Sequence, residues 1–404
     1  MKILFLATGF APYLFSENIV NSKLVSSFLN KGLDVRVISK KDEGPIYGND
    51  WSDWESLKDI TYEIAYVNNK YIDYIRSFLK FKYFIPGLRW NLYAVKLIEK
   101  LQEKYKFDLI ISRSPDDSSH LAALYISKKY NIPWIANFND PMINIWPKPY
   151  EKKIKFINNL FYKNYFNKIF QNASYLTFPS IELANYIKRY YYLNEKKIHI
   201  IPHIGLEDKV LPQNNVIKNN TIKMCHSGNL SKERNPELII KAFSKLIKKY
   251  KSYKLYLDFI GNSDKSFRNL VEKYKLNNNI RFIGPFKYKE SLKIMKNYNI
   301  LLLVEAILKE GIFLPSKFID YAMLNIPICA ITPKNSVVMN YINTYGGGEV
   351  ADSSKEQDIY YKMDIMINNV INNNIENYNT QILYENFKPS NIIFQYEKIF
   401  RELF

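Results

Sequence analysis

The segment HSGNLSKERNPELIIKAF, residues 226–243, brings together a glycine, two cations and a helix start. Gly228 ends an apolar, strand-like run, and a short polar loop then carries Lys232 and Arg234 before a helix with apolar periodicity. A guanidinium placed just after a strand is suited to a bidentate contact with a phosphate. The alternative is a solvated loop that contains a lysine and an arginine without binding anything.

A second segment, FLPSKFIDYAMLNIPI, opens an apolar helix with Pro315, Ser316 and Lys317 and carries a single acid, Asp320, on the expected first turn. Capping explains part of this pattern, because serine suits the N-cap and an acid near a helix start is favoured by the helix dipole. The bare N–H groups of such a turn also hold anions such as phosphate. Since this turn and Arg234 are expected at one edge of the same sheet, together they predict a diphosphate site.

Two polar residues of the first half also follow expected strands. His120 lies in PDDSSH at a strand-to-helix junction, and Asp140 lies in NFNDP directly after a strand. Ligands of open parallel sheets bind at the carboxyl ends of strands, which favours a functional role for both. The alternatives are a helix-start histidine bonded to a neighbouring loop and an ordinary turn aspartate before proline. For His203, in IPHIG, we expect a structural role.

The elements that must position these residues alternate along the chain. KILFLAT reads as a buried strand, a helix ends before Gly32, and LDVRVISK follows as a second strand, which predicts a βαβ unit and a parallel sheet. The alternation continues to a polar, asparagine-rich stretch and then restarts. We therefore predict a first α/β domain at 1–205, a linker at 206–220, a second α/β domain at 221–385 and a C-terminal helix at 386–404.

Composition bounds the class of protein. With 404 residues, 47% hydrophobic and 24% charged, the chain is globular and long enough for two domains. Its net charge of +18 indicates an anionic partner or surface. The two cysteines, Cys225 and Cys329, lie in apolar runs without metal-ligand spacing, and we expect both reduced and buried. The apolar run at the first residues is shorter than the apolar region of a signal peptide, so we expect no signal peptide. No run of about 18 apolar residues occurs, so we expect no membrane-spanning helix.

Taken in order, these segments resemble the family-4 retaining glycosyltransferases of the GT-B fold. SGNL…R…LIIKAF, LDFIGN, IRFIGPF and LPSKFIDYAMLNIPICAI resemble the nucleotide-binding domain of that family. MKILFLATGFAPY, SSHLAALYISKKYNIPWIANFNDP and LTFPSIELANYI resemble its acceptor-side domain, so the likeness covers nearly the whole chain. It implies an α/β protein with two Rossmann-like open-sheet domains facing across a cleft, and a C-terminal helix that crosses back to the first domain.

The resemblance assigns roles residue by residue. Arg234 matches the basic residue on the donor diphosphate, the turn at Gly228 lets the backbone approach the ligand, and Asp320 matches the glutamate that accepts hydrogen bonds from the ribose. Ser316 and Lys317 would supply N–H groups and a cation to the phosphates. The full donor-binding set is Gly228, Asn229, Arg234, Gly284, Pro315, Ser316, Lys317 and Asp320. The catalytic set is His120, Asp140 and Arg234, and Gly9 and Phe10 form an acceptor or donor loop.

The chain departs from the family pattern at two of these positions. The more familiar form has two glutamates with seven residues between them, and the first of those positions is Ile312 here. Glu305 and Glu310 are the candidates to replace it at the donor sugar. Asn229 stands where the family has its first basic residue after the glycine, and a subfamily with PSK…Y in place of the usual motif is the better match.

The expected chemistry needs no metal and no cofactor. Asp116 and Asp117 could suggest metal carboxylates, but helix dipoles and basic residues replace the cation in GT-B enzymes. Arg234, Lys317 and a helix N-terminus would stabilise the leaving nucleoside diphosphate as charge develops on it. The resemblance implies retention by front-face attack, in which the leaving phosphate helps to deprotonate the acceptor.

Two stretches rich in lysine and aromatic residues, 71–90 and 146–170, bear on where the protein works. The second carries six lysines against one glutamate, with eight aromatics. Cationic, aromatic segments lie in the headgroup plane of anionic membranes, although surface helices that pack their rings on their own sheet have the same composition. We expect a cytoplasmic protein, peripheral at the inner face of the plasma membrane, that acts on a glycan or lipid-linked acceptor in the synthesis of lipopolysaccharide, O-antigen or capsule.

Three other classes compete with the transferase. A nucleotide-sugar epimerase would keep the fold and the donor, but it has no use for basic, aromatic stretches. A nucleic-acid-binding protein would explain the charge, but the chain lacks any recognised module, and we expect no nucleic-acid partner. A nicotinamide dehydrogenase is disfavoured because no G-x-G-x-x-G follows the first strand.

Overall fold

The computed structural model describes residues 1–41, 50–65, 70–114, 117–207, 217–262 and 265–404. The chain forms two compact units. The N-terminal unit contains Met1–Ile204 and Pro389–Phe404, and the C-terminal unit contains Gly205–Lys388. The predicted boundaries were 1–205, 221–385 and 386–404, and most of the expected linker, residues 208–216, lies outside the described residues.

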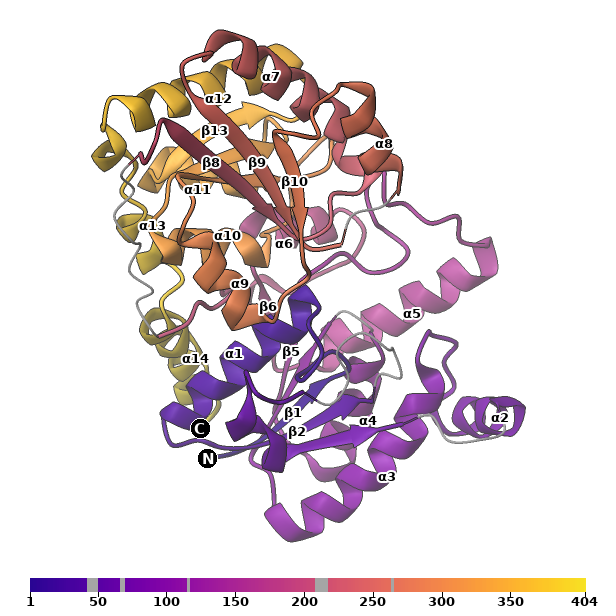
Figure 1. The fold of residues 1–404 in the computed structure, drawn as a ribbon. Coiled ribbons are helices and arrows are strands. Elements are labelled where there is room, and N and C mark those ends of the chain that lie inside the picture. Colours follow the sequence, from indigo (N-terminus) through magenta and orange to yellow (C-terminus); the bar gives the residue numbers. More distant parts are fainter. Residues whose placement is uncertain (42–49, 66–69, 115–116, 208–216, 263–264) are drawn as a thin grey trace. The chain divides into compact units, whose positions relative to one another are not determined.

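The N-terminal unit is built on a parallel sheet of seven strands in the order β3-β2-β1-β4-β5-β6-β7 (Figure 1). The strands are β1 (Lys2–Ala7), β2 (Asp34–Lys40), β3 (Thr61–Ile64), β4 (Leu109–Arg113), β5 (Trp134–Asn137), β6 (Tyr175–Phe178) and β7 (Ile198–Ile200). Every residue of β4 and β5 is buried, as expected for central strands of a parallel sheet that is covered on both faces.

The strands alternate with the helices of this unit. These are α1 (Ser16–Asn30), α2 (Lys70–Phe81), α3 (Leu88–Tyr105), α4 (Ser118–Tyr130), α5 (Phe156–Asn172), α6 (Ile181–Lys188) and α14 (Pro389–Leu403), with short 3₁₀ turns η1 (Glu55–Ile60) and η2 (Glu195–Lys197). Gly32, at φ +76°, follows the end of α1 in the left-handed conformation that closes many helices, as the sequence predicted.

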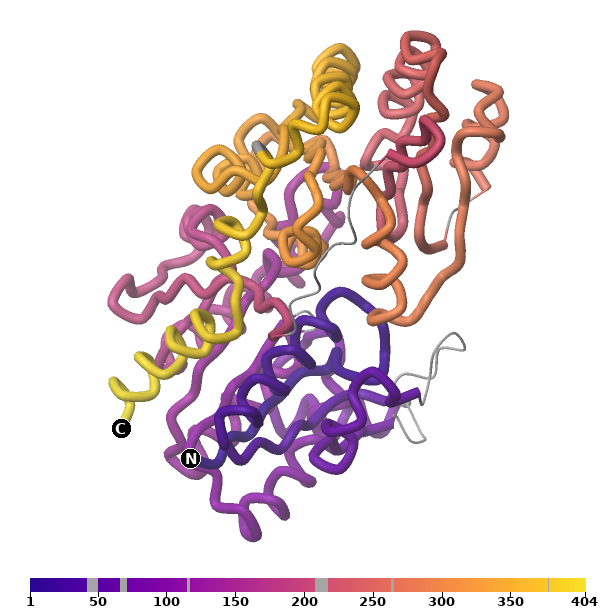
Figure 2. The backbone as a smooth tube through the Cα atoms, turned by 60° about the vertical axis from the view of Figure 1, so that its left-hand side comes forward, coloured from indigo at the N-terminus to yellow at the C-terminus, as the bar shows by residue number. Residues whose placement is uncertain are grey.

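The last helix of the chain belongs to this first unit. In Figure 1 and Figure 2, α14 runs beside α1, and the rings of Phe28 and Tyr396 meet edge to face at 5.3 Å. Tyr396 is 1% exposed and Phe28 is fully buried. The prediction that the C-terminal helix returns to the first domain is therefore confirmed.

The C-terminal unit contains a second parallel sheet, in the order β10-β9-β8-β11-β12-β13. The strands are β8 (Thr221–Ser227), β9 (Lys254–Ile260), β10 (Ile280–Ile283), β11 (Ile300–Val304), β12 (Ile328–Thr332) and β13 (Gly348–Asp352). The helices are α7 (Pro236–Lys249), α8 (Lys265–Lys273), α9 (Tyr288–Met295), α10 (Ser316–Leu324), α11 (Val337–Tyr345), α12 (Glu356–Ile371) and α13 (Gln381–Glu385), with η3 (Lys232–Arg234) and η4 (Ile375–Tyr378). The fold class is thus α/β with two open, doubly wound sheets.

The core of the C-terminal unit lies between its sheet and the pair α7 and α12, which Figure 2 shows side by side. Leu302 of β11, Phe243 of α7 and Met363 of α12 are all fully buried within it. Cys225 in β8 and Cys329 in β12 are free and buried, as predicted. Among the described helices, none is long and apolar enough to cross a bilayer.

Candidate functional site

The carboxyl end of β8 closes on a tight glycine turn. Gly228 has φ +105°, which favours glycine, and its N–H donates to the carbonyl of Ile260 at 2.7 Å. Gly261, at φ +141°, packs directly on it, since a Cβ there would lie 3.3 Å from the carbonyl carbon of Gly228. A Cβ on Gly228 would in turn lie 2.6 Å from Nζ of Lys317. The absence of both side chains thus brings Lys317 against the backbone of the turn.

Arg234 ends the short helix η3, six residues after Gly228. Its Nη1 donates to the carbonyl of Asn229 at 3.0 Å, which holds the guanidinium over the loop. Its Nε is buried and has no hydrogen-bond partner in the described part of the chain. The side chain of Asn229 points to solvent, so this residue contributes its carbonyl to the positioning of Arg234.

Helix α10 begins at Ser316, and its N-cap residue is Pro315, which offers no side-chain acceptor. The expectation that Ser316 caps the helix and that Asp320 lies on its first turn is corrected: Ser316 is the first helical residue, and the first turn carries no acid. The N–H groups of Ser316 and Lys317 make no hydrogen bond to any other described residue. Such N–H groups, which a helix cannot satisfy by itself, are available to an anion.

Lys317 lies between this helix start and the glycine turn. Its Nζ donates to the carbonyl of Ser227 at 2.6 Å. Burial lowers the pKa of its ammonium to about 7, with a further lowering by the positive charge of Arg234 and an opposing effect of Asp320. Burial and the neighbouring guanidinium disfavour the charged form of Lys317, and the negative charge of a bound diphosphate would favour it.

Asp320 is 7% exposed and is held by a second helix. The hydroxyl of Tyr288, the first residue of α9, donates to its Oδ1 at 2.7 Å. The next residue of α10, Tyr321, accepts a hydrogen bond at its hydroxyl from the N–H of Ser227, at 2.8 Å. These two bonds fix α10 to both α9 and the end of β8, so the orientation of Asp320 is set before any ligand arrives.

Glu305 follows β11 directly and is 6% exposed. Its N–H donates to the carbonyl of Ile331 at 2.9 Å, and its carboxylate accepts a short hydrogen bond from the hydroxyl of Thr332. Burial raises the pKa of Glu305 to about 7, while the bond from Thr332 and the charge of Arg234 oppose the rise. Because β11 and β8 are adjacent parallel strands, this carboxyl lies at the same sheet edge as the turn that precedes Arg234.

The other donor-sugar candidate differs from Glu305 in its surroundings. Glu310 is half-buried in the loop between β11 and α10, next to Gly311, whose N–H donates to the carbonyl of Asn335 at 2.7 Å. Ile312, at the position of the missing family glutamate, is 1% exposed and part of the core. Glu305 lies in the electrostatic field of Arg234.

Gly284 follows β10 with φ +59°, and a Cβ on it would lie 2.5 Å from the ring of Phe286. The residue is exposed at the carboxyl end of a strand two positions from β8, so it shares the edge with the cations. His226, which the sequence did not single out, is fully buried below the same edge. Its Nδ1 lies 2.9 Å from the carbonyl of Leu302, and burial lowers the pKa of the ring well below its usual value.

The N-terminal unit carries a second polar cluster at the carboxyl ends of β4 and β5. Arg113, 3% exposed, ends β4; its Nε donates a short hydrogen bond to Asn21, and one Nη lies 3.4 Å from Oδ1 of Asn139. Asn139 in turn donates a short hydrogen bond to a carboxylate oxygen of Glu17, on the first turn of α1. Asp140 follows Asn139 and forms no hydrogen bond with another described residue.

Glu17 and Asp140 are coupled acids. Burial raises the pKa of Glu17 to about 8, and the charge of Asp140 raises it further, while Arg113 and Asn139 oppose the rise. Burial also raises the pKa of Asp140 to about 6. Between about pH 6 and pH 8 the pair therefore holds one proton, so at neutral pH it can both donate and accept hydrogen bonds.

This pair predicts a pH-dependent gain in stability for Glu17→Gln. The folded-state pKa of Glu17 is raised from 4.5, so the cost of ionising it is absent below about pH 4.5, grows as pH rises and is complete above about pH 8. One pKa unit corresponds to about 1.4 kcal/mol, and partial solvent screening reduces the full shift, so we expect a gain on the order of 2 kcal/mol at pH 8 and none at pH 4. Urea unfolding across this pH range measures it.

The matched control is Glu103→Gln, which neutralises an exposed glutamate of α3 in the same unit. We expect its free energy of unfolding to stay within 0.5 kcal/mol of the parent at every pH, as is usual for surface substitutions. A gain for Glu17→Gln that is equally large at pH 4 would contradict the coupled pair, because the parent carboxyl is then neutral as well.

Two residues predicted for this site lie in the core instead. His120, fully buried on the first turn of α4, packs on Phe138 with ring centroids 4.5 Å apart, and its Nδ1 lies 2.8 Å from the hydroxyl of Ser112. Burial lowers its pKa to about 3, so it stays neutral. The structure thus places it in the core, and its catalytic role stays a prediction. Phe10 is likewise fully buried against Phe5, so its ring cannot contact an acceptor.

The remaining predicted positions fall into three groups. Gly9 lies beside the cluster, where its carbonyl accepts from Asn21 at 2.8 Å. His203 is 5% exposed, in keeping with the structural role expected for it. Asp116 lies outside the described residues, whereas the carbonyl of Asp117 accepts a hydrogen bond from Tyr165 at 2.5 Å, so that residue fixes the start of α4.

Sequence reasoning missed four residues of these sites. Glu17 gave no signal because its partner is distant in sequence; the bond from Asn139 to Glu17 spans 122 positions. Nothing in a single sequence predicts that Tyr288 bonds to Asp320 or that Thr332 bonds to Glu305. A useful signal was available for Arg113 alone, since a charged residue that closes an apolar strand run is costly to bury unless it is paired.

Two family models match the chain, one on each unit. A model described as Glycosyltransferase Family 4 matches residues 20–204, and a model described as Glycosyl transferases group 1 matches residues 207–381. The chain is a family-4-like glycosyltransferase of the GT-B fold. The resemblance inferred from the motifs is confirmed, and the protein is an enzyme of the transferase class.

Individual proteins agree with this glycosyltransferase assignment. The chain is 24% identical over 315 residues to an uncharacterized glycosyltransferase, MJ1059, of Methanocaldococcus jannaschii, a match that covers 72% of this chain and 74% of that protein. Its fold is similar to that of sucrose-phosphate synthase from Thermosynechococcus elongatus, at TM-score 0.71, 12% identity and coverage of 100% and 98%. It is also similar to Anabaena HepE in complex with UDP and glucose, at TM-score 0.70, 13% identity and full coverage of both chains.

The epimerase alternative shares the fold more distantly. The UDP-GlcNAc 2-epimerase of Methanocaldococcus jannaschii is similar at TM-score 0.53 and 15% identity, covering 91% of this glycosyltransferase and 93% of that chain. Neither family model describes an epimerase, a nucleic-acid-binding protein or a dehydrogenase. The transferase is therefore the class that the sequence models support.

Proposed function

We propose that this glycosyltransferase moves a sugar, with retention of configuration, from a nucleoside-diphosphate sugar to a glycan or lipid-linked acceptor in the synthesis of a bacterial surface polysaccharide of the lipopolysaccharide, O-antigen or capsule type. The observation that carries the donor assignment is the meeting of Arg234, Lys317 and the start of α10 at one sheet edge. A diphosphate has the charge and the acceptor oxygens that these groups lack.

The proposed chemistry follows from where these groups lie. As the bond between the sugar and the diphosphate breaks, negative charge grows on the leaving oxygen. The guanidinium of Arg234, the ammonium of Lys317 and the free N–H groups of α10 stabilise that charge without reorganising, which is the most effective form of electrostatic catalysis. The carboxylate of Asp320 accepts hydrogen bonds from the ribose hydroxyls, and that of Glu305 accepts hydrogen bonds from hydroxyls of the donor sugar.

On the N-terminal unit, the pair Glu17 and Asp140 is the proposed place for the acceptor. A pair of acids that shares one proton near neutral pH presents one donor and several acceptors, which suits the hydroxyl groups of a sugar. Asp140 keeps its predicted role here, and Glu17 joins it. Arg113 and Asn139 position the pair from below and have no expected contact with the acceptor.

The function is tested by thermal stabilisation with a panel of nucleoside diphosphates and sugar nucleotides in the presence of EDTA. A ligand that binds the native state stabilises it by RT ln(1 + [L]/Kd), so one family of nucleotides should raise the melting temperature. EDTA is included because we propose that no metal takes part. The proposal fails if no nucleotide stabilises the protein with or without added Mg²⁺.

Lys317 makes a separate prediction about proton uptake. At pH 8 its ammonium is mostly deprotonated in the free protein, because its pKa is about 7. A bound diphosphate favours the charged form and raises that pKa, so binding should take up close to one proton. Calorimetry with the most stabilising nucleoside diphosphate, repeated in two buffers of different ionisation enthalpy, measures the uptake. Lys317→Met should abolish it; unchanged uptake in that variant would remove Lys317 from the diphosphate.

The proposed membrane contact rests on helix α2, which buries polar residues and exposes apolar ones. In α2, the polar residues Asp73 and Ser77 are buried, at 4% and 0% exposure, whereas Tyr71 and Ile75 are 83% and 60% exposed. A surface helix normally buries its apolar side. The hydroxyl of Tyr93, on α3, donates to Asp73 at 2.6 Å, which fixes α2 in this orientation.

Helix α5 also exposes apolar side chains, since Phe156 and Leu160 are 78% and 51% exposed. The ring of Phe84, just after α2, lies 5.1 Å from that of Phe78 and 6.2 Å from that of Phe161 on α5. We call the combined surface the α2–α5 face; its exposed apolar members are Tyr71, Ile72, Tyr74, Ile75, Leu79, Phe84, Phe156, Ile157, Leu160 and Phe161.

Exposed cations lie in and next to the two helices of the α2–α5 face: Arg76, Lys80, Lys82, Lys152, Lys153, Lys155, Lys163 and Lys168. An apolar surface with a basic border fits the headgroup region of an anionic membrane, where apolar side chains enter the acyl boundary and cations meet lipid phosphates. We propose that the enzyme docks there, at the cytoplasmic side of the membrane, and meets a lipid-linked acceptor.

The vesicle prediction is specific. The enzyme should float with vesicles of phosphatidylglycerol and phosphatidylethanolamine, and about tenfold less with pure phosphatidylcholine. The triple variant Ile75→Ser, Phe156→Ser, Ile157→Ser should lose most of the binding, because it removes apolar area from both helices of the face. The matched control, Tyr192→Ser with Ile382→Ser, changes exposed apolar residues elsewhere and should bind as the parent does. Equal loss in both variants would contradict the assignment.

A further inference from the structure

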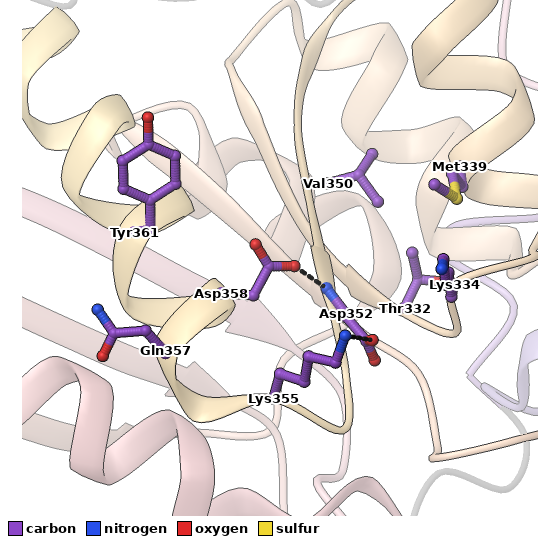
Figure 3. A pocket seen from close by; sticks show the side chains of 9 residues that line it. All are labelled: Thr332, Lys334, Met339, Val350, Asp352, Lys355, Gln357, Asp358 and Tyr361. Carbon is purple, nitrogen blue, oxygen red and sulfur yellow. Dashed lines mark hydrogen bonds and ion pairs between the residues drawn. The ribbon is translucent and has the colours of Figure 1, made fainter.

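A cavity of about 600 Å³ opens at the carboxyl ends of β12 and β13, within the C-terminal unit (Figure 3). Its volume lies in the range of small-molecule sites. The donor groups Arg234, Lys317 and Asp320 are not among the residues that line it. Its wall nevertheless includes Thr332, the residue whose hydroxyl bonds to Glu305. The cavity is therefore distinct from the diphosphate site and adjoins the proposed donor-sugar carboxylate.

The walls of the cavity are fixed by hydrogen bonds within the unit. Ser336 caps α11, because its hydroxyl oxygen accepts a hydrogen bond from the N–H of Met339 at 3.0 Å. Its Oγ also lies 2.8 Å from Oγ1 of Thr332, which accepts from Ser336 while it donates to Glu305. On the neighbouring strand β13, the N–H of Asp352 donates to a carboxylate oxygen of Asp358 on α12, at 2.7 Å (Figure 3). The shape of the cavity thus exists before any ligand binds, which reduces the entropic cost of binding.

The charges of the cavity cancel. Two lysines, Lys334 and Lys355, stand against two aspartates, Asp352 and Asp358. Lys355 is already paired with Asp352 at 3.4 Å, and Asp358 already accepts from the backbone. A phosphate would meet the two aspartates and a metal ion would meet the two lysines, so the lining favours a neutral ligand.

Three polar groups of the lining remain uncommitted. The ammonium of Lys334, the amide of Gln357 and the hydroxyl of Tyr361 form no hydrogen bond with any other described residue. The ring of Tyr361 is 56% exposed on α12, and Met339 and Val350 supply apolar surface across from it (Figure 3). A ligand that matches this lining carries hydroxyl groups and also an apolar C–H face.

We propose that this cavity is a saccharide subsite that binds a neutral sugar residue of the acceptor or product glycan. This inference rests on the proposed function, to which it adds that the enzyme recognises a glycan beyond the sugar it transfers. One face of the sugar ring lies against Tyr361, while Lys334 and Gln357 donate hydrogen bonds to its hydroxyls. Through Thr332, an occupied cavity also supports the orientation of Glu305.

The test uses the whole enzyme labelled with ¹³C at its methionine methyl groups, of which the chain has eight. Maltose, cellobiose and lactose are each titrated to tens of millimolar, with inorganic phosphate as a separate arm. We expect the Met339 signal to shift with at least one disaccharide and not with phosphate. Tyr361→Ala and Gln357→Ala should each weaken the response about tenfold, which corresponds to about 1.4 kcal/mol. Tyr192→Ala, at a ring 84% exposed in the other unit, should leave it unchanged.

The outcomes separate this inference from the function on which it rests. If nucleotides stabilise the enzyme but no disaccharide moves the Met339 signal, the saccharide subsite is wrong and the transferase proposal stands. A Met339 shift with phosphate alone would also overturn it, in favour of an anion site. If a disaccharide shifts Met339 while no nucleotide stabilises the protein, the subsite stands and the donor assignment falls.

Discussion

Replacing Arg234 by alanine should reduce sugar transfer about 10²–10³-fold, the usual cost of removing one fixed donor from a developing negative charge. The side chain is half-buried, its Nη1 bonds only to the carbonyl of Asn229 within the described residues, and its Nε is unpartnered, so the fold loses little. Initial rates at saturating donor measure the effect, and the melting temperature of the free variant checks the fold.

The matched control is Lys232→Ala, which removes an exposed cation from the same short helix. We expect its transfer rate to stay within about threefold of the parent, because a solvent-exposed charge contributes little. Near-normal turnover by Arg234→Ala, or an equal loss of rate in both variants, would contradict the assignment of Arg234 to the diphosphate.

The second large effect is expected for Glu305→Gln. The variant should lower the maximal rate about 100-fold and leave the affinity for the nucleoside diphosphate within about twofold, because Glu305 is proposed to contact the sugar and not the nucleotide. A site built to hydrogen-bond a hydroxyl discriminates strongly when that bond is removed. Calorimetry and initial rates, taken together, separate the two quantities.

The pH profile adds a readout that a purely structural role would not move. The pKa of Glu305 is raised to about 7, so its carboxylate forms as pH rises through that value and the parent rate should rise with it. Glu305→Gln should lose this limb. Asp320→Asn is the contrasting control: it should weaken nucleotide binding about tenfold and keep most of the rate at saturation. The reverse pattern in the two variants would exchange their assignments.

Much of this architecture could be predicted from the sequence because strands, helices and glycine turns have local signatures. The apolar run before Gly228 predicted β8, and the segment after Pro315 predicted a helix that the structure places at Ser316–Leu324. Parallel strands bring their carboxyl ends to one edge, so Arg234 and Lys317 could be placed together without knowing a single contact. That part of the site follows from topology.

What a single sequence could not supply is the direction of a side chain and the identity of its distant partner. His120 and Asp140 both follow strands, yet the first turns into the core against Phe138 and the second stays at the edge beside Glu17. The pairing of Glu17 with Asp140 depends on where the first turn of α1 lies relative to the loop that follows β5. Periodicity predicts that α1 exists, but it does not predict that position.

The return of α14 to the N-terminal unit has a consequence for how the protein comes into being. Because Pro389–Phe404 completes a unit whose other residues end at Ile204, the C-terminal unit is in effect an insertion within it. Domains generally fold as they leave the ribosome, the first one earliest. Here the C-terminal unit is synthesised completely before the N-terminal unit is. Phe28 cannot pack against Tyr396 until the last helix has been made. A chain cut short before Pro389 should therefore keep the C-terminal unit folded and leave an apolar face of α1 open to aggregation.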